Sequence, residues 1–444
     1  MIVLSMQPIY MVIKYMMPIS NGNLSKIIRW GSVELFFIVS VISTIMFGIF
    51  SAAVVSEMKL SQAMLGWLSG VFFIVYAFTQ LYSGRLFTQF SSRLILCTSA
   101  VIAGIGAIIF ADTNNIVCMF IARILLGAGL ASTFVGVLYI VQVNFSPYSF
   151  PVMSSLSQTL ANIGSGVFGC LAEFVVIHYN YRCCFYALGI ALLICAIFML
   201  FCLNDRQGQI TIDMSDEGTF LTRLKIIIQL PQVWYATFYF FGLFGAMLTF
   251  ADLFGVEYQM KSFHIAFATA TILNAMIPFG LAFGCVIAGL WTQRIHNYVL
   301  PARVFALCAV ITFIMILSLR LNSLFVIAII YFMFGIGCSG SILSFQCIQR
   351  QVYNLRLRPL ATSFVLTTSY LLSGLVQQPI VGSLITNVSN QRVEHPIEYK
   401  WLFDFAVHDE WYKYNSGLCF ILIFIVVSFV VSLLFKNGEI NEKL

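Results

Sequence analysis

Three charged residues interrupt long apolar runs of this 444-residue sequence: Arg123, Glu173 and Asp252. A charged side chain inside a bilayer is costly unless it has a partner or lines a water-filled cavity, so each is a candidate functional residue. Arg123 and Glu173 fall at similar depth on consecutive apolar segments. They therefore predict either a structural salt bridge or a pair that takes part in proton coupling or solute binding. Asp252 lies near the end of its segment, where we expect its side chain to reach interfacial water.

Polar, uncharged side chains also fall in the middle of apolar runs. Such residues can line a solute pathway, but they also hydrogen-bond neighbouring helices in lipid, so both interpretations stay open. The candidates for lining a substrate cavity are Gln80, Gln158, Asn162, Asn274, Tyr331, Gln377 and Gln378.

Sequence motifs for catalysis, cofactors and metals are missing. The chain has no phosphate-binding G-x-x-x-x-G-K-[ST], no H-E-x-x-H zinc motif and no G-x-S-x-G nucleophile motif. Its five histidines lie in loops or at helix ends, and its twelve cysteines form no paired C-x-x-C ligand set. The net charge of +6 comes from scattered Lys and Arg residues, which does not indicate nucleic-acid binding. We therefore predict a protein that is not an enzyme and needs no metal or cofactor.

Apolar runs make up most of the sequence. Hydrophobic residues account for 60% of it and charged residues for 9%, and the mean hydropathy is +0.95. A soluble fold could not hide this much apolar surface. A helix needs about 20 apolar residues to cross a bilayer, and no run alternates like a barrel strand, so we predict an all-α membrane protein. The twelve predicted spans are Val33–Val55, Ala63–Ser83, Leu94–Ala111, Ile116–Val141, Pro151–Ile177, Cys184–Leu203, Val233–Val256, Ile265–Leu290, Val304–Leu319, Leu324–Ile348, Ala361–Ile385 and Gly417–Phe435.

The twelve runs divide six and six about one long polar break. We predict an N-terminal cytoplasmic or interfacial segment (1–32), a first six-helix bundle (33–203), a linker (204–232), a second bundle (233–435) and a short tail (436–444). Two such bundles, related as parallel repeats, enclose a solute pathway in known transporters.

The distribution of basic residues predicts the orientation in the membrane. Fifteen of the 23 Lys and Arg residues fall in segments on the side of the two termini, seven fall on the other side, and Arg123 lies within a helix. The positive-inside rule then places both termini and the linker in the cytoplasm. The apolar stretch Met1–Met17 lacks the features of a signal peptide, and an interfacial helix or an upstream start codon explains it better than a thirteenth span.

The two halves repeat each other, which strengthens the six-plus-six division. Small residues that recur at one spacing also suit helix interfaces that must slide during transport. The matches are Arg123–Gly129 with Tyr331–Gly337, Pro151 with Pro359 and Gly166 with Gly374, all 208 residues apart, and Gly84–Gln89 with Gly289–Arg294, 205 residues apart.

These motifs resemble those of the major facilitator superfamily. The segment from Gly84 to Arg93 resembles a degenerate version of the family's loop motif G-x-L-A-D-R-x-G-R-R. The fourth span matches the family's R-x-x-x-G-x-G motif. The resemblance runs from about Glu34 to Phe435 and implies two six-helix bundles. Within the superfamily, the chain most resembles the phthalate-permease-like and amino-acid permeases of intracellular bacteria. The residues that match the conformational motifs or their repeats are Gly84, Thr88, Arg93, Gly127, Gly129, Gly289, Gln293, Gly335 and Gly337.

Thr88 stands where the family has an aspartate. In the family that carboxylate lies near the N-terminus of the eleventh helix, where it complements the helix dipole. A neutral hydroxyl contributes no charge, so the resemblance implies a weaker hold on the outward-open state, unless Thr88 is simply tolerated in the loop.

The sequence therefore predicts a secondary transporter in the inner membrane of a bacterium, acting as a monomer by alternating access. A single intramembrane arginine with carboxylates nearby suits an amino acid or an organic monocarboxylate, and protons are the expected coupling ion. Two alternatives remain open. One is an efflux antiporter for drugs or metabolites, and the other is a non-transporting receptor or adaptor on the same scaffold.

Overall fold

The computed structural model describes residues 21–145, 150–203, 220–295, 297–318, 323–352, 357–394 and 410–436. Every regular element within these ranges is a helix. Eleven helical segments of the described part are long and apolar enough to cross a membrane, and α9 is a further helix of 29 residues. The prediction of an all-α membrane fold is confirmed.

The first half of the chain supplies six long helical segments, the first of which is followed by the short helix α4 and the fourth of which is made of α7 and α8. Their bounds are α3 (Asn21–Ile49), α4 (Ser51–Met58), α5 (Gln62–Gln89), α6 (Ser92–Asp112), α7 (Ile116–Leu130), α8 (Thr133–Asn144), α9 (Phe150–His178) and α10 (Tyr181–Cys202).

The second half supplies six more, preceded by the short helix α11. The seventh and eleventh segments contain π-helical turns (η1, η2 and η5), and the tenth contains a 3-10 turn (η3). The bounds are α11 (Phe220–Ile228), α12 (Pro231–Phe240), η1 (Phe241–Gly245), α13 (Ala246–Thr249), η2 (Phe250–Phe254), α14 (Gly255–Phe263), α15 (Phe267–Ile295), α16 (Val299–Ser318), α17 (Leu324–Ser339), η3 (Gly340–Ile342), α18 (Leu343–Gln351), α19 (Arg358–Leu372), η5 (Ser373–Gln377), α20 (Gln378–Glu394) and α22 (Glu410–Leu433).

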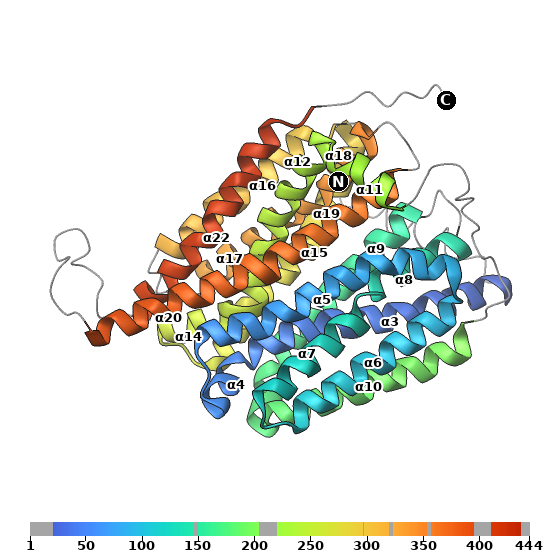
Figure 1. The fold of residues 1–444 in the computed structure, drawn as a ribbon. Coiled ribbons are helices and arrows are strands. Elements are labelled where there is room, and N and C mark those ends of the chain that lie inside the picture. Colours follow the sequence, from blue (N-terminus) through green and yellow to red (C-terminus); the bar gives the residue numbers. More distant parts are fainter. Residues whose placement is uncertain are drawn as a thin grey trace.

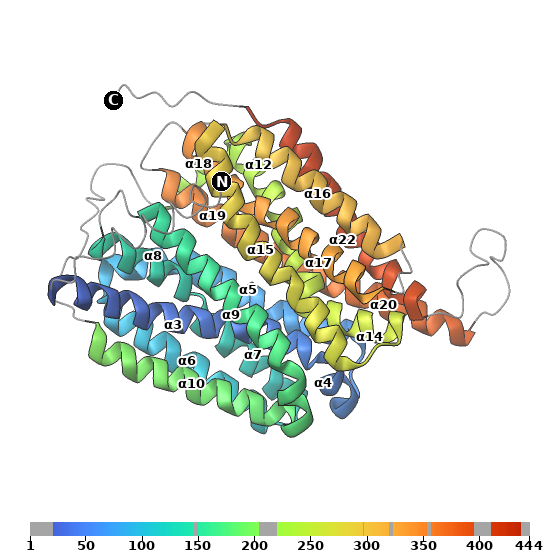
Figure 2. The same ribbon diagram turned by 180° about the vertical axis from the view of Figure 1, so that it is seen from behind.

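The two halves form two bundles. In Figure 1 the blue to green helices α3–α10 lie together below the yellow-green to red helices α12–α22, and Figure 2 shows the same division from behind. We call the end of the molecule where α10 stops and α12 begins the linker end, and the opposite end, which carries α4 and the end of α14, the far end. In both views the bundles converge toward the far end.

Several helices extend beyond the predicted spans. The first helix begins at Asn21 rather than Val33, because its polar opening residues are tied to other helices: Arg29 donates to Asn144 (3.3 Å) and Trp30 Nε1 donates to Ser157 Oγ (3.0 Å). Such tertiary contacts sustain helix where hydropathy alone predicts a loop. The seventh segment likewise continues to Phe263 rather than ending at Val256.

The repeated glycines of the fourth and tenth segments occupy equivalent places in the two bundles. A Cβ on Gly127 would collide with the backbone of α5, and one on Gly129 with the backbone of α6. In the second half, a Cβ on Gly335 would collide with α15, and one on Gly337 with α16. The repeat found in the sequence therefore corresponds to a repeat in how the helices pack.

Candidate functional site

The bundles contact each other along two antiparallel helix pairs, α5 with α19–α20 and α9 with α15, and also where α3 meets η2. Along the first pair, Gly66 faces the backbone of Gln378, and Gly70 faces that of Gly374. Because α5 starts at the far end, these close contacts lie in the far half of the molecule. Toward the linker end of the same helix, Phe78 is 53% exposed.

The second pair repeats this arrangement with other residues. Gly169 of α9 faces Ala275 of α15, and a Cβ on Gly166 would lie 2.8 Å from the ring of Phe279. Gly166 and Gly374 are the repeat-related glycines of the fifth and eleventh segments. Both stand at a contact between bundles, and both of these contacts lie in the far half of the molecule.

A polar clasp joins the bundles at the far end. Gln62 Nε2 of α5 donates to both carboxylate oxygens of Glu257 on α14, at 3.0 and 3.1 Å, and Lys261 Nζ lies 2.8 Å from Glu257 Oε1. Beside it, the backbone N–H of Ala63 donates to Thr386 Oγ1 of α20 (3.0 Å). Sequence reasoning missed Glu257, because the seventh span was predicted to stop one residue before it. The Glu257 residue is 2% exposed.

Aromatic and hydroxyl side chains meet between the bundles at mid-helix. The rings of Tyr76 on α5 and Tyr370 on α19 have centroids 4.8 Å apart, and their hydroxyls interact. Phe73 stacks on Tyr370 at 6.0 Å, and Phe244 of η1 meets it edge-on at 5.8 Å. Tyr76 also interacts with the hydroxyl of Thr133 on α8. The cluster therefore connects both bundles, on the linker side of the glycine contacts of α5.

Asp252 lies next to this cluster, on the π-helical turn η2. Its side chain interacts with the Thr44 hydroxyl of α3 across the bundle interface and acts electrostatically on Tyr370. It is 8% exposed, so our expectation that it reaches interfacial water is wrong. The physical reason is that the helix continues to Phe263, which places Asp252 well inside the span. Asn274 Nδ2 of α15 donates to the carbonyl of Ala251 at the same turn (2.8 Å).

Arg123 is buried inside the first bundle, at 1% exposure. Its guanidinium lies over the rings of Phe47 (4.1 Å) and Phe72 (4.4 Å), and its Nε donates to the carbonyl of Leu68 (3.2 Å). Cation–π contacts of this kind stabilise a desolvated guanidinium by about 2 kcal/mol. Arg123 forms no ion pair with a carboxylate whose side chain is described.

The predicted pairing of Arg123 with Glu173 stays a prediction, because the Glu173 side chain lies outside the described side chains. The helices that carry the two residues pack against different neighbours. Helix α7 packs mainly on α5 and α6, whereas α9 packs on α3 and α15.

Glu34 is a buried carboxylate that sequence reasoning placed at the start of the first helix. Because α3 begins at Asn21, Glu34 instead lies more than three turns into the helix, and it is 3% exposed. It lies beside Ser157 of α9. Neither of its oxygens accepts a well-formed hydrogen bond from a described residue, and no described cation pairs with it. The signal that could have found it is Trp30, because tryptophan is typical of the membrane–water interface and Glu34 follows it by one helical turn.

The polar residues predicted to line a cavity divide into two groups. Gln377 and Gln378 bond the seventh segment, through Thr249 Oγ1 (3.0 Å) and the Leu248 carbonyl (3.2 Å), and thus hold helices together as Asn274 does. The others make no side-chain hydrogen bond to another helix within the described part of the chain. Gln80 and Tyr331 are buried with unbonded oxygens, Asn162 Nδ2 bonds its own helix at the Gln158 carbonyl (2.8 Å), and Gln158 is half-buried.

The degenerate loop motif lies largely on a helix. Helix α5 continues through Gly84 and Thr88 to Gln89, and α6 starts at Ser92, just before Arg93. The side chains of Thr88 and Gln293 lie outside the described side chains, so the consequence of the missing aspartate stays a prediction. A Cβ on Gly289 would meet nothing within 4 Å, unlike one on the glycines of the fourth and tenth segments.

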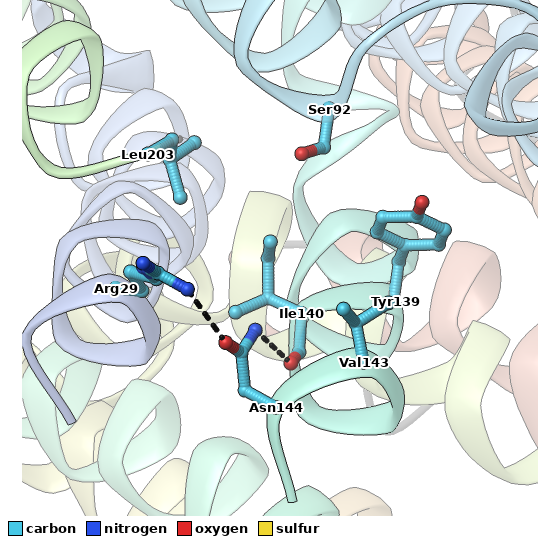
Figure 3. Close-up of a pocket in the computed structure, with 7 residues that line it drawn as sticks. All are labelled: Arg29, Ser92, Tyr139, Ile140, Val143, Asn144 and Leu203. Carbon is cyan, nitrogen blue, oxygen red and sulfur yellow. Dashed lines mark hydrogen bonds between the residues drawn. The ribbon is translucent and has the colours of Figure 1, made fainter. Parts of the chain in front are cut away.

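A small recess opens at the linker end of the first bundle (Figure 3). The Asn144 amide points into it, bridging Arg29 and the Ile140 carbonyl (2.9 Å). The recess is lined by Arg29, Ser92, Tyr139, Ile140, Val143, Asn144 and Leu203, all from one bundle.

Comparison with known proteins agrees with this geometry. Among solved structures, a bacterial homologue of the human lysosomal transporter Spinster, in an inward-facing and unoccupied conformation, superposes with a TM-score of 0.73 at 12% identity, over 94% of this chain and 99% of that one. A point mutant of the nucleoside transporter NupG superposes with a TM-score of 0.70 at 14% identity, over 93% and 100%. At these identities the similarity shows the fold.

Two curated proteins match by sequence. The membrane sensor protein UhpC of Escherichia coli is 20% identical over 271 residues, which cover 54% of this chain and 58% of UhpC. The efflux pump apf11 of Gibberella fujikuroi is 25% identical over 139 residues, 31% of this chain and 25% of the pump. The matched parts thus span less than two thirds of either relative.

The family model of the Major Facilitator Superfamily matches residues 35–388, most of the chain and parts of both bundles. The chain therefore belongs to the major facilitator superfamily.

Proposed function

We propose that this protein is a secondary active transporter that carries a small polar solute by alternating access, with an amino acid or an organic monocarboxylate as the favoured class. One observation carries the proposal. The bundles are in close contact in the far half of the molecule, and buried polar side chains from both bundles meet beside this contact. Glycine contacts and the Gln62–Glu257 clasp hold the far end shut. Polar groups from both bundles meet on the linker side of these contacts, where a solute site reached from that side would lie.

The linker end faces the cytoplasm in this proposal, so the described state is inward-facing. Native cysteines test the orientation. Cys183 is exposed at the far end of α10, and Cys202 lies at the linker end of the same helix. A membrane-impermeant maleimide should label Cys183 on intact cells, and Cys183→Ser should remove that label. Labelling of Cys202 in cells that have not been permeabilised would contradict this orientation and place the linker end outside.

Transport itself is tested in proteoliposomes. We expect the purified protein to exchange labelled amino acids or monocarboxylates and to accumulate one of them when a pH gradient is imposed. Protein-free vesicles give the leak rate. A flux that does not depend on the pH gradient would contradict proton coupling but would still support the transport function.

Glu173 remains the proposed proton carrier, with Arg123 as the cation that influences it. Glu173→Gln should retain exchange but lose uphill accumulation, because a neutral amide cannot change its protonation state. Replacing both residues with neutral side chains of similar size should leave transport pH-dependent if the pair is only structural. Uphill transport that survives in Glu173→Gln would move the coupling role to Asp252.

Two other functions are favoured by the sequence matches. The similarity to a membrane sensor protein supports a receptor that binds a solute without moving it, and the similarity to an efflux pump supports export. Tight binding of one solute without flux would support the receptor. Export of many unrelated apolar compounds would support efflux.

A further inference from the structure

Asp252 is a buried carboxylate that no described cation neutralises. The ion pairs found in the described part of the chain, Arg182 with Glu57 and Lys261 with Glu257, do not include it. Arg123, the intramembrane cation, is covered by two phenylalanine rings and lies outside ion-pair distance of Asp252. A carboxylate at this depth requires a positive charge or a proton to offset its lost hydration.

The surroundings of Asp252 are aromatic as well as polar. Tyr370, on which Asp252 acts electrostatically, is in contact with the rings of Phe73, Tyr76 and Phe244. Tyr370 therefore connects the carboxylate to a group of four rings that comes from three helical segments. Aromatic faces attract organic ammonium groups, and aromatic cages are the recurring device for binding them. Small inorganic cations instead prefer several oxygen ligands.

The position of this group also suits a solute. It lies between the bundles, with Thr44 on α3, Tyr76 on α5, Asp252 on η2 and Tyr370 on α19. Thr44, Phe244 and Tyr370 remain partly exposed, whereas Phe73 and Tyr76 are buried. A ligand held here would contact both bundles at once: the second bundle would supply the charge of Asp252, and the first would supply the Thr44 hydroxyl.

We propose that Asp252, with the Thr44 hydroxyl and the ring of Tyr370, against which Tyr76 and Phe244 pack, forms a binding subsite for the ammonium group of a small organic solute. This inference rests on the proposed transport function and narrows its substrate to amine-bearing compounds. The carboxylate pairs with the ammonium group, the Thr44 and tyrosine hydroxyls accept its remaining hydrogens, and the rings cover the carbon next to it. Within the favoured classes, an amino acid fits this subsite and a simple monocarboxylate does not.

The test measures ligand binding to the purified protein. Binding is detected as an increase in the melting temperature, which grows with the occupancy of the site. The probes are matched sets built on one skeleton: an amino acid, the amine that remains after loss of its carboxyl group, and the acid that remains after loss of its amino group. One such set is leucine, 3-methylbutylamine and 4-methylpentanoate, and the other amino acids supply the rest. We expect the amino acid and amine of at least one set to bind and the deaminated acid to bind at least tenfold more weakly.

Substitutions locate the effect at Asp252. Asp252→Asn should weaken amine binding by about tenfold or more, as expected for loss of a charge-assisted hydrogen bond, whereas Asp252→Glu should retain part of it. The matched control is Asp112→Asn, which neutralises an exposed carboxylate bonded to Tyr186 at the far end and should change nothing. Sodium chloride in place of the amine should give no stabilisation that depends on Asp252.

Three outcomes would overturn the proposal. These are equal binding of the deaminated acids, unchanged amine affinity in a folded Asp252→Asn protein, and transport of a solute that lacks an amino group while no amine binds. A protein that binds amines through Asp252 but shows no flux would instead contradict the transport function and leave the subsite standing. A protein that neither binds nor transports any solute would contradict both.

Discussion

Gly66 offers a direct way to disturb the closed far end. An alanine Cβ at this position would lie 2.6 Å from the carbonyl oxygen of Gln378 and 3.2 Å from the Cα of Pro379, both in the backbone of the facing helix. Carbon atoms normally remain at about 3.5 Å or more from non-bonded neighbours. Helices α5 and α20 would therefore have to separate by about 1 Å, because neither contact is with a side chain that can rotate away.

The substitution should act on one conformation only. Overpacking a close contact costs about 1–3 kcal/mol, and this cost disappears in a state whose far ends are apart. An energy difference of that size shifts a two-state equilibrium by about 5- to 150-fold. Gly66→Ala should therefore move the population away from the closed far end, toward the outward-open state in the proposed orientation.

Hydrogen–deuterium exchange measures the shift without labels. We expect faster exchange in the peptides of α5 and α20 that face each other at the far end. The matched control is Gly31→Ala, since a Cβ at this glycine meets nothing within 4 Å. This substitution should leave exchange at the far end unchanged. Unchanged exchange in a folded Gly66→Ala protein would refute the view that this contact holds the far end closed.

Three further substitutions address the polar groups of the bundles. Gln62→Leu removes the hydrogen bonds from Gln62 to Glu257, so far-end exchange should rise as it does for Gly66→Ala; unchanged exchange would show that the clasp adds nothing. Arg123→Met replaces a cation whose described partners are two aromatic rings and a carbonyl with an apolar side chain of similar length. If Arg123 has no acidic partner, the free energy of unfolding should fall by less than about 2 kcal/mol. A loss of about 3–5 kcal/mol would instead show that a buried carboxylate had been left unpaired. Glu34→Gln should keep the fold and solute exchange but reduce pH-driven accumulation if Glu34 exchanges a proton during transport; unaltered accumulation would exclude it.

The membrane helices could be predicted because apolar length is a local property. Twelve long runs gave the helices and their order, and the 208-residue repeat gave the correspondence between the bundles. The helix ends could not be predicted in this way. Trp30 and Arg29 extend α3 toward Asn21 because they bond α9 and α8, and a hydropathy pattern carries no information about partners so distant in the sequence.

The candidate site could be predicted only in part for the same reason. Asp252 was recognised from its charge, but its depth depended on where the seventh segment ends. Glu257 fell outside the predicted span, and its bond to Gln62 joins residues 195 positions apart. The pairing of Arg123 with Glu173 stays a prediction. The rings of Phe47 and Phe72, which the structure places against Arg123, could not be predicted because no spacing rule connects them to it.

The repeat distinguishes residues at the contacts between the bundles, which occur in both halves, from candidate solute-binding residues, which occur in one half. Gly166 and Gly374 correspond across the two halves, and both stand where the bundles touch. Arg123 corresponds to Tyr331 instead, and Asp252 has no acidic counterpart 208 residues earlier, where Thr44 stands. Two similar bundles need matching contacts to rock against each other, but an asymmetric solute needs different groups at its two ends. Substitutions at the paired glycines should therefore alter the conformational equilibrium whatever solute is present, whereas substitutions at Asp252 should change which solutes bind.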